Sequence, residues 1–115
     1  MSERLLVTGG AGFIGSHVCE ELVHRGHQVW ILDDFNDQYP PSLKRRNISG
    51  LIDRESVHLV EGDVRDTVLV AGLLLDVPFD AVVHLAGRAP FQTAADEPDA
   101  CYEANTRSTL RLLEA

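Results

Sequence analysis

Residues 8–15 read TGGAGFIG, and they directly follow a short apolar run at residues 5–7. From Ile14 to Leu22 apolar residues recur at fourfold spacing, which is typical of one face of a helix. Gly26 then stands where a glycine commonly ends a helix. The sequence therefore predicts a strand, a glycine-rich turn and a helix, in that order.

The same alternation continues along the rest of the chain. Strands are expected at residues 29–32, 57–60 and 81–85, and helices at residues 42–51, at 67–75 behind an Asp66 N-cap, and from Pro98 to the end. Strands that are apolar on both faces are typical of a parallel sheet covered by helices on both sides. Because crossovers in such sheets are right-handed, the strand order should be 3-2-1-4. This is the N-terminal half of a Rossmann-type, doubly wound α/β fold.

The charge and hydropathy pattern disfavours two classes of partner. Among 115 residues, 18 are acidic and 10 are basic, a net charge of -8 that opposes binding to polynucleotides. The longest apolar stretch, residues 68–75, is far shorter than the roughly 20 residues of a membrane span. The N-terminal apolar run is also too short for a signal peptide. We expect a cytoplasmic protein with no nucleic-acid or membrane partner.

The cysteines and histidines show no metal-binding pattern. Cys19 and Cys101 lie far apart, in neither a disulfide framework nor a C-x-x-C motif, which favours a reduced, cytoplasmic setting. His17, His24 and His27 lie near Cys19 but do not have zinc-ligand spacing. We expect no metal site.

The glycines of the turn fit a phosphate-binding pattern. Gly10, Gly12 and Gly15 match G-x-G-x-x-G, and Gly9, Gly12 and Gly15 match T-G-x-x-G-x-x-G. Such glycines permit a tight turn, close approach of the backbone to a pyrophosphate, and close packing of helix on strand. The pyrophosphate would lie on the N–H groups and positive dipole of the following helix. The alternative is a glycine turn with a structural role alone.

An acidic residue follows the turn at the distance expected for a dinucleotide site. Asp33 comes 18 residues after Gly15, at the end of the second strand, where a carboxylate can accept hydrogen bonds from the adenosine ribose. The 2'-phosphate of NADP would meet this carboxylate and that of Asp34, so NAD is favoured. The alternative is that Asp33 and Asp34 only begin a turn.

Together these motifs resemble the extended short-chain dehydrogenase/reductases, the NAD-dependent epimerase/dehydratase family, over essentially the whole chain. GDVRD at residues 62–66 is similar to the family segment that binds the adenine edge, and HLAG at residues 84–87 is similar to its H-L-A-A, which lines the nicotinamide ribose side. The resemblance implies NAD as the cofactor, with no metal. It implies this set of cofactor-binding residues: Gly9, Gly12, Phe13, Ile14, Gly15, Asp33, Asn36, Asp63, Val64, Leu85, Ala86 and Gly87.

Several matched positions have a second interpretation. Asp63 could be only a turn residue. His84 is more typical of a packed strand histidine than of an acid or base. Asn105 matches the family's Asn that helps hold the active-site backbone, but could be a surface helix residue. The basic run at residues 44–46 is more typical of a solvated face than of a phosphate site.

Within the family, the loop after the second strand points to a subgroup. Residues 33–39, followed by Leu43-Lys44-Arg45, are similar to D-N-F-N-D-Y-Y and L-K-R of UDP-glucuronate 4-epimerases. Residues 89–94 depart from A-G-V-R-Y-S, because Gln92 stands where the subgroup has Arg. A neutral amide cannot supply the charge-assisted contact of that Arg. The resemblance thus implies a nucleotide-sugar epimerase, an isomerase, with a UDP-sugar as a partner.

The family's catalytic pair, Tyr-x-x-x-Lys, is absent. Tyr39 and Tyr102 are followed four residues later by Leu43 and Thr106, and the only lysine is Lys44. Because this pair carries the proton transfer, the chain should lack catalytic residues. We expect residues 1–115 to be a partial NAD-binding domain that is not catalytically competent alone.

Two further interpretations stay open, and so does the assembly state. The chain could be a stand-alone dinucleotide-binding module, or part of a carbonyl reductase of the same fold. A stable soluble monomer would favour the stand-alone module. For a partial domain, the edge strand and the final helix should instead expose apolar surface and favour self-association. The leucines concerned are Leu110, Leu112 and Leu113, whose alternative role is packing on the sheet.

Overall fold

The computed structural model describes residues 2–35, 40–87 and 98–114. Strands and helices alternate as β1 (Arg4–Thr8), α1 (Phe13–His24), β2 (Gln28–Asp33), α2 (Pro41–Ile48), β3 (Val57–Glu61), α3 (Thr67–Asp76), β4 (Ala81–His84), α5 (Pro98–Tyr102), the π-helical turn η1 (Glu103–Arg107) and α6 (Ser108–Glu114). The predicted alternation is confirmed. The helix expected over residues 42–51 ends earlier, at Ile48, and continues as turns.

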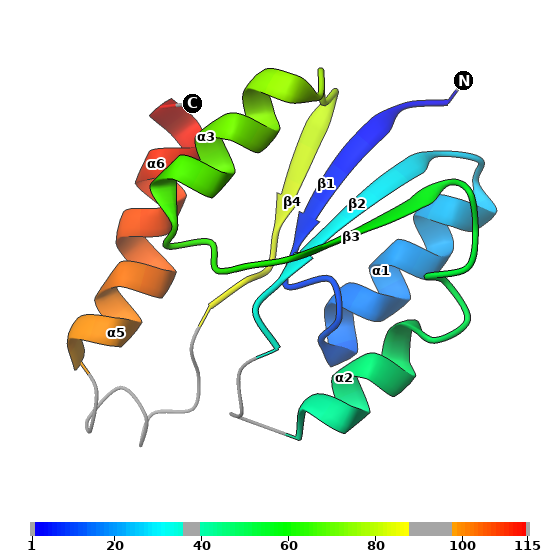
Figure 1. The fold of residues 1–115 in the computed structure, drawn as a ribbon, viewed down its shortest axis with the longest axis horizontal. Coiled ribbons are helices and arrows are strands. Elements are labelled where there is room, and N and C mark those ends of the chain that lie inside the picture. Colours follow the sequence, from blue (N-terminus) through cyan, green and yellow to red (C-terminus); the bar gives the residue numbers. More distant parts are fainter. Residues whose placement is uncertain (1, 36–39, 88–97, 115) are drawn as a thin grey trace.

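The strands form one parallel sheet in the order β3-β2-β1-β4, which confirms the predicted Rossmann-type topology. Thr8 at the end of β1 is in register with Leu32 of β2 and with His84 of β4. Asp33 is in register with Glu61 of β3. The carboxyl ends of all the strands are therefore aligned along one edge of the sheet (Figure 1).

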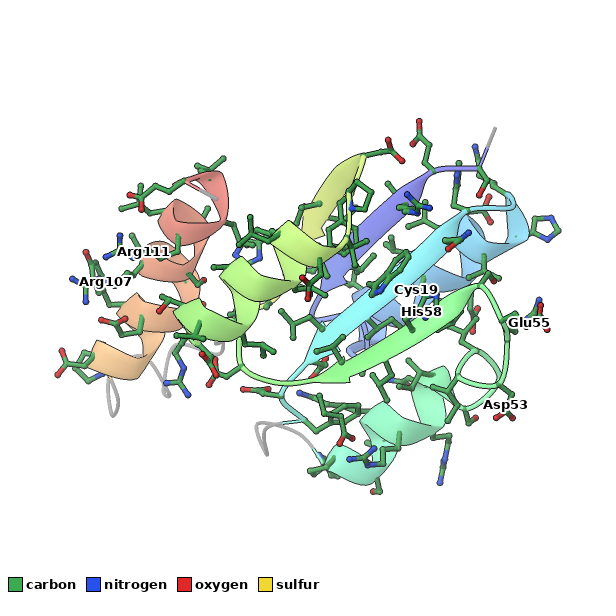
Figure 2. The ribbon with its side chains drawn as sticks, turned by 45° about the horizontal axis from the view of Figure 1, so that its top comes forward. Cys19, Asp53, Glu55, His58, Arg107 and Arg111 are labelled. Atoms are coloured by element: carbon green, nitrogen blue, oxygen red, sulfur yellow. The ribbon has the colours of Figure 1, made fainter. Side chains whose placement is uncertain are left out.

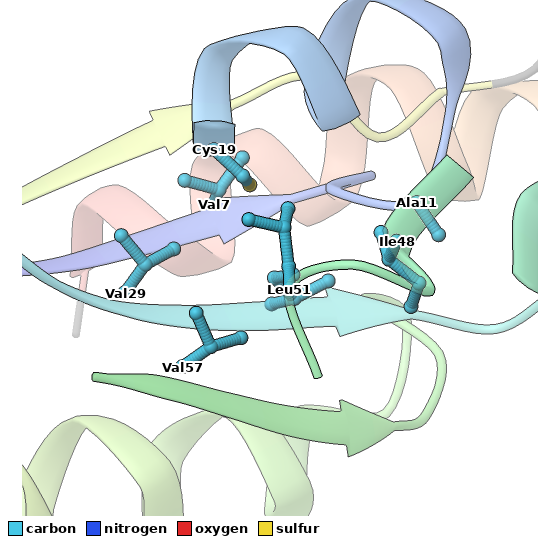
Figure 3. Packing of buried hydrophobic residues seen from close by; sticks show 8 residues of the cluster. Val7, Ala11, Cys19, Val29, Ile48, Leu51 and Val57 are labelled. Atoms are coloured by element: carbon cyan, nitrogen blue, oxygen red, sulfur yellow. The ribbon is translucent and has the colours of Figure 1, made fainter. Parts of the chain in front are cut away.

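Helices cover both faces of the sheet (Figure 1). Successive side chains of a strand point to opposite faces. Val7, Val29 and Ile31 pack in the cluster on the α1 and α2 face, part of which is drawn in Figure 3. Leu6 and Leu32 pack in a second cluster with residues of α3. The sheet centre is fully buried on both faces, which explains the continuous apolar runs in the sequence.

The helix ends follow the local signals in the sequence. Gly26 has φ 89°, and its N–H donates to Val23 O at 3.0 Å while His27 N donates to Leu22 O at 3.1 Å. This pair of bonds is a Schellman motif, which satisfies carbonyls at the end of α1. At the start of α3, the Asp66 carboxylate accepts from Leu69 N at 3.1 Å. Both predicted signals are confirmed.

The C-terminal helical segment begins at Pro98 as predicted, but it is not uniformly α-helical. The π-helical turn η1 interrupts it, and hydrophobic periodicity gives no signal for such a turn. Asn105 of η1 faces Gly87, and Thr109 of α6 contacts His84 at 3.0 Å. These contacts join the segment to β4 and its following loop. Figure 2 shows Arg107 and Arg111 on the outer side of this segment.

Cys19 belongs to the core rather than to a reactive site. It is completely buried, its Sγ lies 3.9 Å from Gly10 O, and burial, aided by Glu20, raises its pKa to about 12. Across the described residues there is no group of three or more His, Cys, Asp or Glu placed to hold a metal ion. No described helix is both long and apolar enough to cross a membrane.

Candidate dinucleotide site

Backbone hydrogen bonds join the carboxyl ends of the strands into one edge. Gly9 N donates to Leu32 O at 2.8 Å, linking β1 to β2. Gly62 N donates to Asp33 O at 3.0 Å, and this bond links β2 to β3. On the other side of β1, Leu85 N donates to Thr8 O at 3.1 Å. The chain leaves β1 towards one face and β4 towards the other, which is where open α/β sheets bind ligands.

The glycines of the turn are required for different reasons. Gly9 has φ 70°, and a Cβ there would lie 2.9 Å from Ala86 N. A Cβ on Gly15 would overlap the Gly9 carbonyl, so this glycine permits the close packing of α1 on the turn. Gly12 has φ −71° and ψ 176°, which any residue can adopt. Its backbone conformation therefore does not explain the glycine.

The N-terminus of α1 offers hydrogen-bond donors. Its first helical bond runs from Ser16 N to Gly12 O at 2.9 Å, and Gly12 supplies no side-chain cap. Within the described residues, the N–H groups of Phe13, Ile14 and Gly15 have no hydrogen-bond acceptor. The side chains of Phe13 and Ile14 are exposed. This helix end can therefore bind an anionic group such as a pyrophosphate.

Asp33 is buried beside the turn, with only 5% of its surface exposed. Its Oδ2 accepts from Ala11 N at 3.1 Å, and its Oδ1 accepts from Phe35 N at 2.8 Å. The contact with Phe35 N agrees with the turn interpretation. The contact with Ala11 places the same carboxylate against the glycine turn, so the two interpretations are not exclusive.

The basic run at residues 44–46 is not a solvated face throughout, and that expectation was wrong for Lys44. Lys44 is 6% exposed, and its Nζ lies 3.5 Å from Asp33 Oδ1. Arg45 pairs with Glu61 at 2.5 Å and lies over the Phe35 ring, 4.2 Å from its centroid. The charge pattern gave no sign of this arrangement, because it depends on the way α2 packs against the sheet.

Asn47 is a further contact that the sequence analysis missed. Its Nδ2 donates to Ala11 O at 3.0 Å, and Ile48 packs in the same buried cluster as Ala11. Lys44, Asn47 and Ile48 have the i, i+3, i+4 spacing of one helix face. That spacing was the available signal, although it does not show what the face contacts.

Asp63 and Val64 begin the turn after β3. The Asp63 carboxylate accepts from Arg65 N at 2.8 Å and from the Arg65 guanidinium at 2.5 to 3.0 Å. These side-chain hydrogen bonds raise the pKa of Arg65 above its ordinary value, although burial opposes them. The Val64 side chain is buried, and its N–H has no partner within the described residues. A backbone donor and a fixed carboxylate thus occur together at this end of β3.

The residues after β4 are held by a network centred on His84. The Thr8 hydroxyl accepts from Leu85 N at 3.0 Å and from Ala86 N at 3.1 Å, and lies 2.6 Å from His84 Nδ1. His84 Nε2 lies 3.0 Å from the Thr109 hydroxyl, which itself donates to Asn105 O. With both its lone pairs used, the Thr8 hydroxyl donates to Nδ1, so His84 is neutral with its proton on Nε2. Burial lowers the pKa of His84, in agreement with this state.

The structure brings most of the predicted site residues to this one edge. A Cβ on Gly87 would lie 2.7 Å from Asn105 Oδ1, so Asn105, although exposed as the alternative interpretation expects, also faces the segment after β4. Asn36 lies outside the described residues, as does the 89–94 segment with its Gln92.

The sequence profile of the NAD dependent epimerase/dehydratase family matches residues 5–115. The chain belongs to this family. Among curated family members, UDP-glucuronate 4-epimerase 3 of Arabidopsis thaliana is 44% identical over 110 residues, which are 96% of this chain and 25% of that protein. UDP-glucose 4-epimerase of Klebsiella pneumoniae is 36% identical over 115 residues, covering 97% of this chain and 78% of its counterpart.

Solved structures of family members have the same fold. The UDP-glucuronic acid 4-epimerase of Bacillus cereus, in complex with UDP-glucuronic acid and NAD, superposes with a TM-score of 0.86 at 34% identity, over 96% of this chain and 35% of that one. UDP-glucose 4-epimerase of Thermus thermophilus, in complex with NAD, has a TM-score of 0.78 at 35% identity, over 96% and 32% of the two chains. This family member thus spans about a quarter of the Arabidopsis relative and a third of these two structures. NAD is the cofactor of the family.

Proposed function

We propose that this chain is the NAD-binding N-terminal part of a UDP-sugar 4-epimerase of the UDP-glucuronate type. One observation carries the proposal: the glycine cradle, the uncapped N-terminus of α1 and the buried Asp33 carboxylate converge at the carboxyl edge of the sheet. The helix N-terminus offers donors for a pyrophosphate, and Asp33 offers an acceptor for a ribose. Ala11 of the glycine turn connects the two, because its N–H donates to the Asp33 carboxylate. This pairing of groups suits a dinucleotide.

Each part of the cofactor would have its own group of residues. The N–H groups of Phe13, Ile14 and Gly15 would bind the pyrophosphate, and Gly9 and Gly12 would let it approach the backbone. Asp33 would accept hydrogen bonds from the adenosine ribose, together with Asn36 three residues further along the chain. The remaining roles are the adenine edge for Asp63 and Val64, and the nicotinamide side for Leu85, Ala86 and Gly87.

NAD is favoured over NADP by the charge at the ribose position. A 2'-phosphate would have to lie next to the Asp33 carboxylate, which is buried and therefore poorly screened. The Lys44 ammonium offsets part of this negative charge, but it is buried and lies next to Oδ1 of the carboxylate. Oδ2 keeps its place beside the glycine turn.

Catalysis would need residues that this chain does not supply. When bound, NAD supplies a hydride acceptor, and the chain's own residues hold and orient it. The sequence contains no Tyr-x-x-x-Lys to move the accompanying proton. We therefore propose that the chain alone binds the cofactor without epimerising a sugar. The substrate class rests on the loop at residues 33–45 and on the named relatives.

Calorimetric titration with NAD and NADP tests the proposal. We expect tighter binding of NAD, and Asp33→Ala should weaken it about tenfold or more, since a hydrogen bond to a charged group contributes about 1.5 to 3 kcal/mol. The same substitution should bring the affinities for NAD and NADP closer together. Asp53→Ala, in the exposed turn before β3 (Figure 2), removes an equal charge away from the site and should change neither affinity. Equal affinities of the unmodified chain for NAD and NADP would contradict the assignment.

A further inference from the structure

Lys44 and Asp33 form a buried ion pair at the candidate ribose position. Their side chains are 7% and 4% exposed, and Lys44 Nζ lies 3.5 Å from Asp33 Oδ1. Removing both charges from water is unfavourable, so a buried pair is weak evidence for a role in stability. Lys44 is the only lysine of the sequence, and it is buried beside this carboxylate. Because stability does not explain the pair well, a role in binding has to be considered.

The two oxygens of the Asp33 carboxylate accept different numbers of hydrogen bonds. Asp33 Oδ1 receives Phe35 N at 2.8 Å and Lys44 Nζ, whereas Oδ2 receives only Ala11 N at 3.1 Å within the described residues. Each carboxylate oxygen can accept about two hydrogen bonds. Oδ2 therefore retains an acceptor position, and it is the oxygen nearer the glycine turn.

The helix that carries Lys44 is fastened to the same turn. Asn47, one turn further along α2, donates to Ala11 O at 3.0 Å, and Ile48 packs in the core cluster that contains Ala11. Ala11 thus contacts Asp33 through its N–H and α2 through its carbonyl. The position of the Lys44 ammonium is consequently coupled to the geometry of the turn.

We propose that Lys44 is a positioning residue for the cofactor: its ammonium balances the buried Asp33 charge and holds Oδ1, so that Oδ2 faces a hydroxyl of the adenosine ribose. This inference rests on the proposed NAD site. It differs from a purely structural role in one respect. A structural tie between α2 and the sheet supports every part of the cofactor equally, whereas a positioning role concerns the ribose hydroxyls alone.

The test compares two ligands, NAD and the NAD analogue that lacks both hydroxyls of the adenosine ribose. Lys44→Met keeps the length of the side chain and removes the ammonium. It should weaken NAD binding about tenfold, and weaken binding of the dideoxy analogue less than about threefold. Arg46→Met removes a cation from the exposed side of the same helix and should leave both affinities unchanged. Equal losses for both ligands, or no loss for NAD, would overturn the proposal.

A second measurement does not depend on a variant that folds. Because Lys44 is the only lysine, selective ¹⁵N-lysine labelling gives a single side-chain ammonium signal. That signal should shift when NAD is added to the unmodified chain, and shift clearly less with the dideoxy analogue. Identical responses to the two ligands would contradict the positioning role. Failure of the proposed function is a different result, in which the unmodified chain binds neither ligand.

Discussion

At the scale of single residues, Gly12 differs from the other glycines of the turn. Gly9 needs its positive φ, and Gly15 needs its lack of a Cβ to pack on the turn. The extended conformation of Gly12 suits any residue. If close approach of a pyrophosphate is the reason for this glycine, then substituting it should damage binding far more than folding.

Gly12→Val should therefore abolish NAD binding while most of the helical content remains, because the branched side chain fills the space where pyrophosphate meets backbone. Melting temperature measured with and without NAD, together with far-ultraviolet circular dichroism, checks this. Gly72→Val makes the same change in α3, where a Cβ has no neighbour within 4 Å, and should keep the NAD-dependent rise. A rise in the Gly12 variant equal to that of the unmodified chain would disprove the phosphate role of the turn.

His84 should make stability depend on pH. Burial lowers its pKa below the ordinary value of 6.5, so the unfolded chain binds this proton more readily than the folded chain. The stabilisation by neutral His84 is fully present above about pH 6.5 and is lost as pH falls towards the lower folded-state pKa. The free energy of unfolding in urea should fall more steeply from about pH 7 to pH 5 than in His84→Gln. His24→Gln, at an exposed position, should retain the steep fall, and parallel profiles for all three would contradict the account.

Residues whose positions follow from local pattern were predictable from the sequence. The glycine spacing and the position of Asp33 after a strand led to the edge of the sheet where the structure places them. Lys44 and Asn47 could not be predicted in the same way. Their contacts with Asp33 and Ala11 depend on how α2 packs, and a basic run in the sequence is the same whether a helix turns it inwards or outwards.

At the scale of elements, strands and helices were predictable where the apolar residues follow one clear spacing along the sequence. The buried strands read as apolar runs, and the end of α1 follows the glycine signal. The turn η1 was missed because π-helical turns are rare and the sequence carries no recognisable signal for one. The early end of α2 was missed because Leu51 remains buried beyond it, so the apolar pattern continues after the helix stops.

The two aspartates at the ends of α3 provide a test at this scale. Asp66 caps the helix by accepting from Leu69 N, so Asp66→Ala should lower the free energy of unfolding by about 1 kcal/mol. Asp76 is the last residue of the same helix, where a negative charge opposes the helix dipole. Asp76→Ala should therefore leave stability unchanged or raise it slightly. Urea titration of both variants checks the pair, and equal losses would mean that the cap does not stabilise α3.

At the scale of the whole molecule, apolar surface remains uncovered along one side. β4 pairs only with β1 within the described sheet, and Val82 on it is 39% exposed. The leucines of α6 divide between the two predicted roles: Leu112 packs against the core, whereas Leu110 and Leu113 are exposed. An unpaired strand edge next to exposed leucines favours association between copies.

We therefore expect purified chain to self-associate with rising concentration, and to show no epimerase turnover with NAD and UDP-glucuronate. The turnover prediction follows from the missing Tyr-x-x-x-Lys, since general acid/base catalysis typically contributes about 10² to 10⁴ in rate. Light scattering and sugar analysis on the same sample measure both. Leu113→Glu, at an exposed position, should reduce association without unfolding the chain. A strictly monomeric sample that converts many sugar molecules per chain would contradict both expectations.

The most direct test of the proposed site is a titration of ¹⁵N-labelled chain with NAD, followed by the shifts of its backbone amide signals. We expect the largest shifts at Phe13, Ile14 and Gly15, which begin α1, and at Val64 and Ala86, which lie after the carboxyl ends of β3 and β4. Amides at the opposite ends of the strands should change little. Shifts confined to those opposite ends, or none at NAD concentrations that saturate the related epimerases, would contradict the central claim.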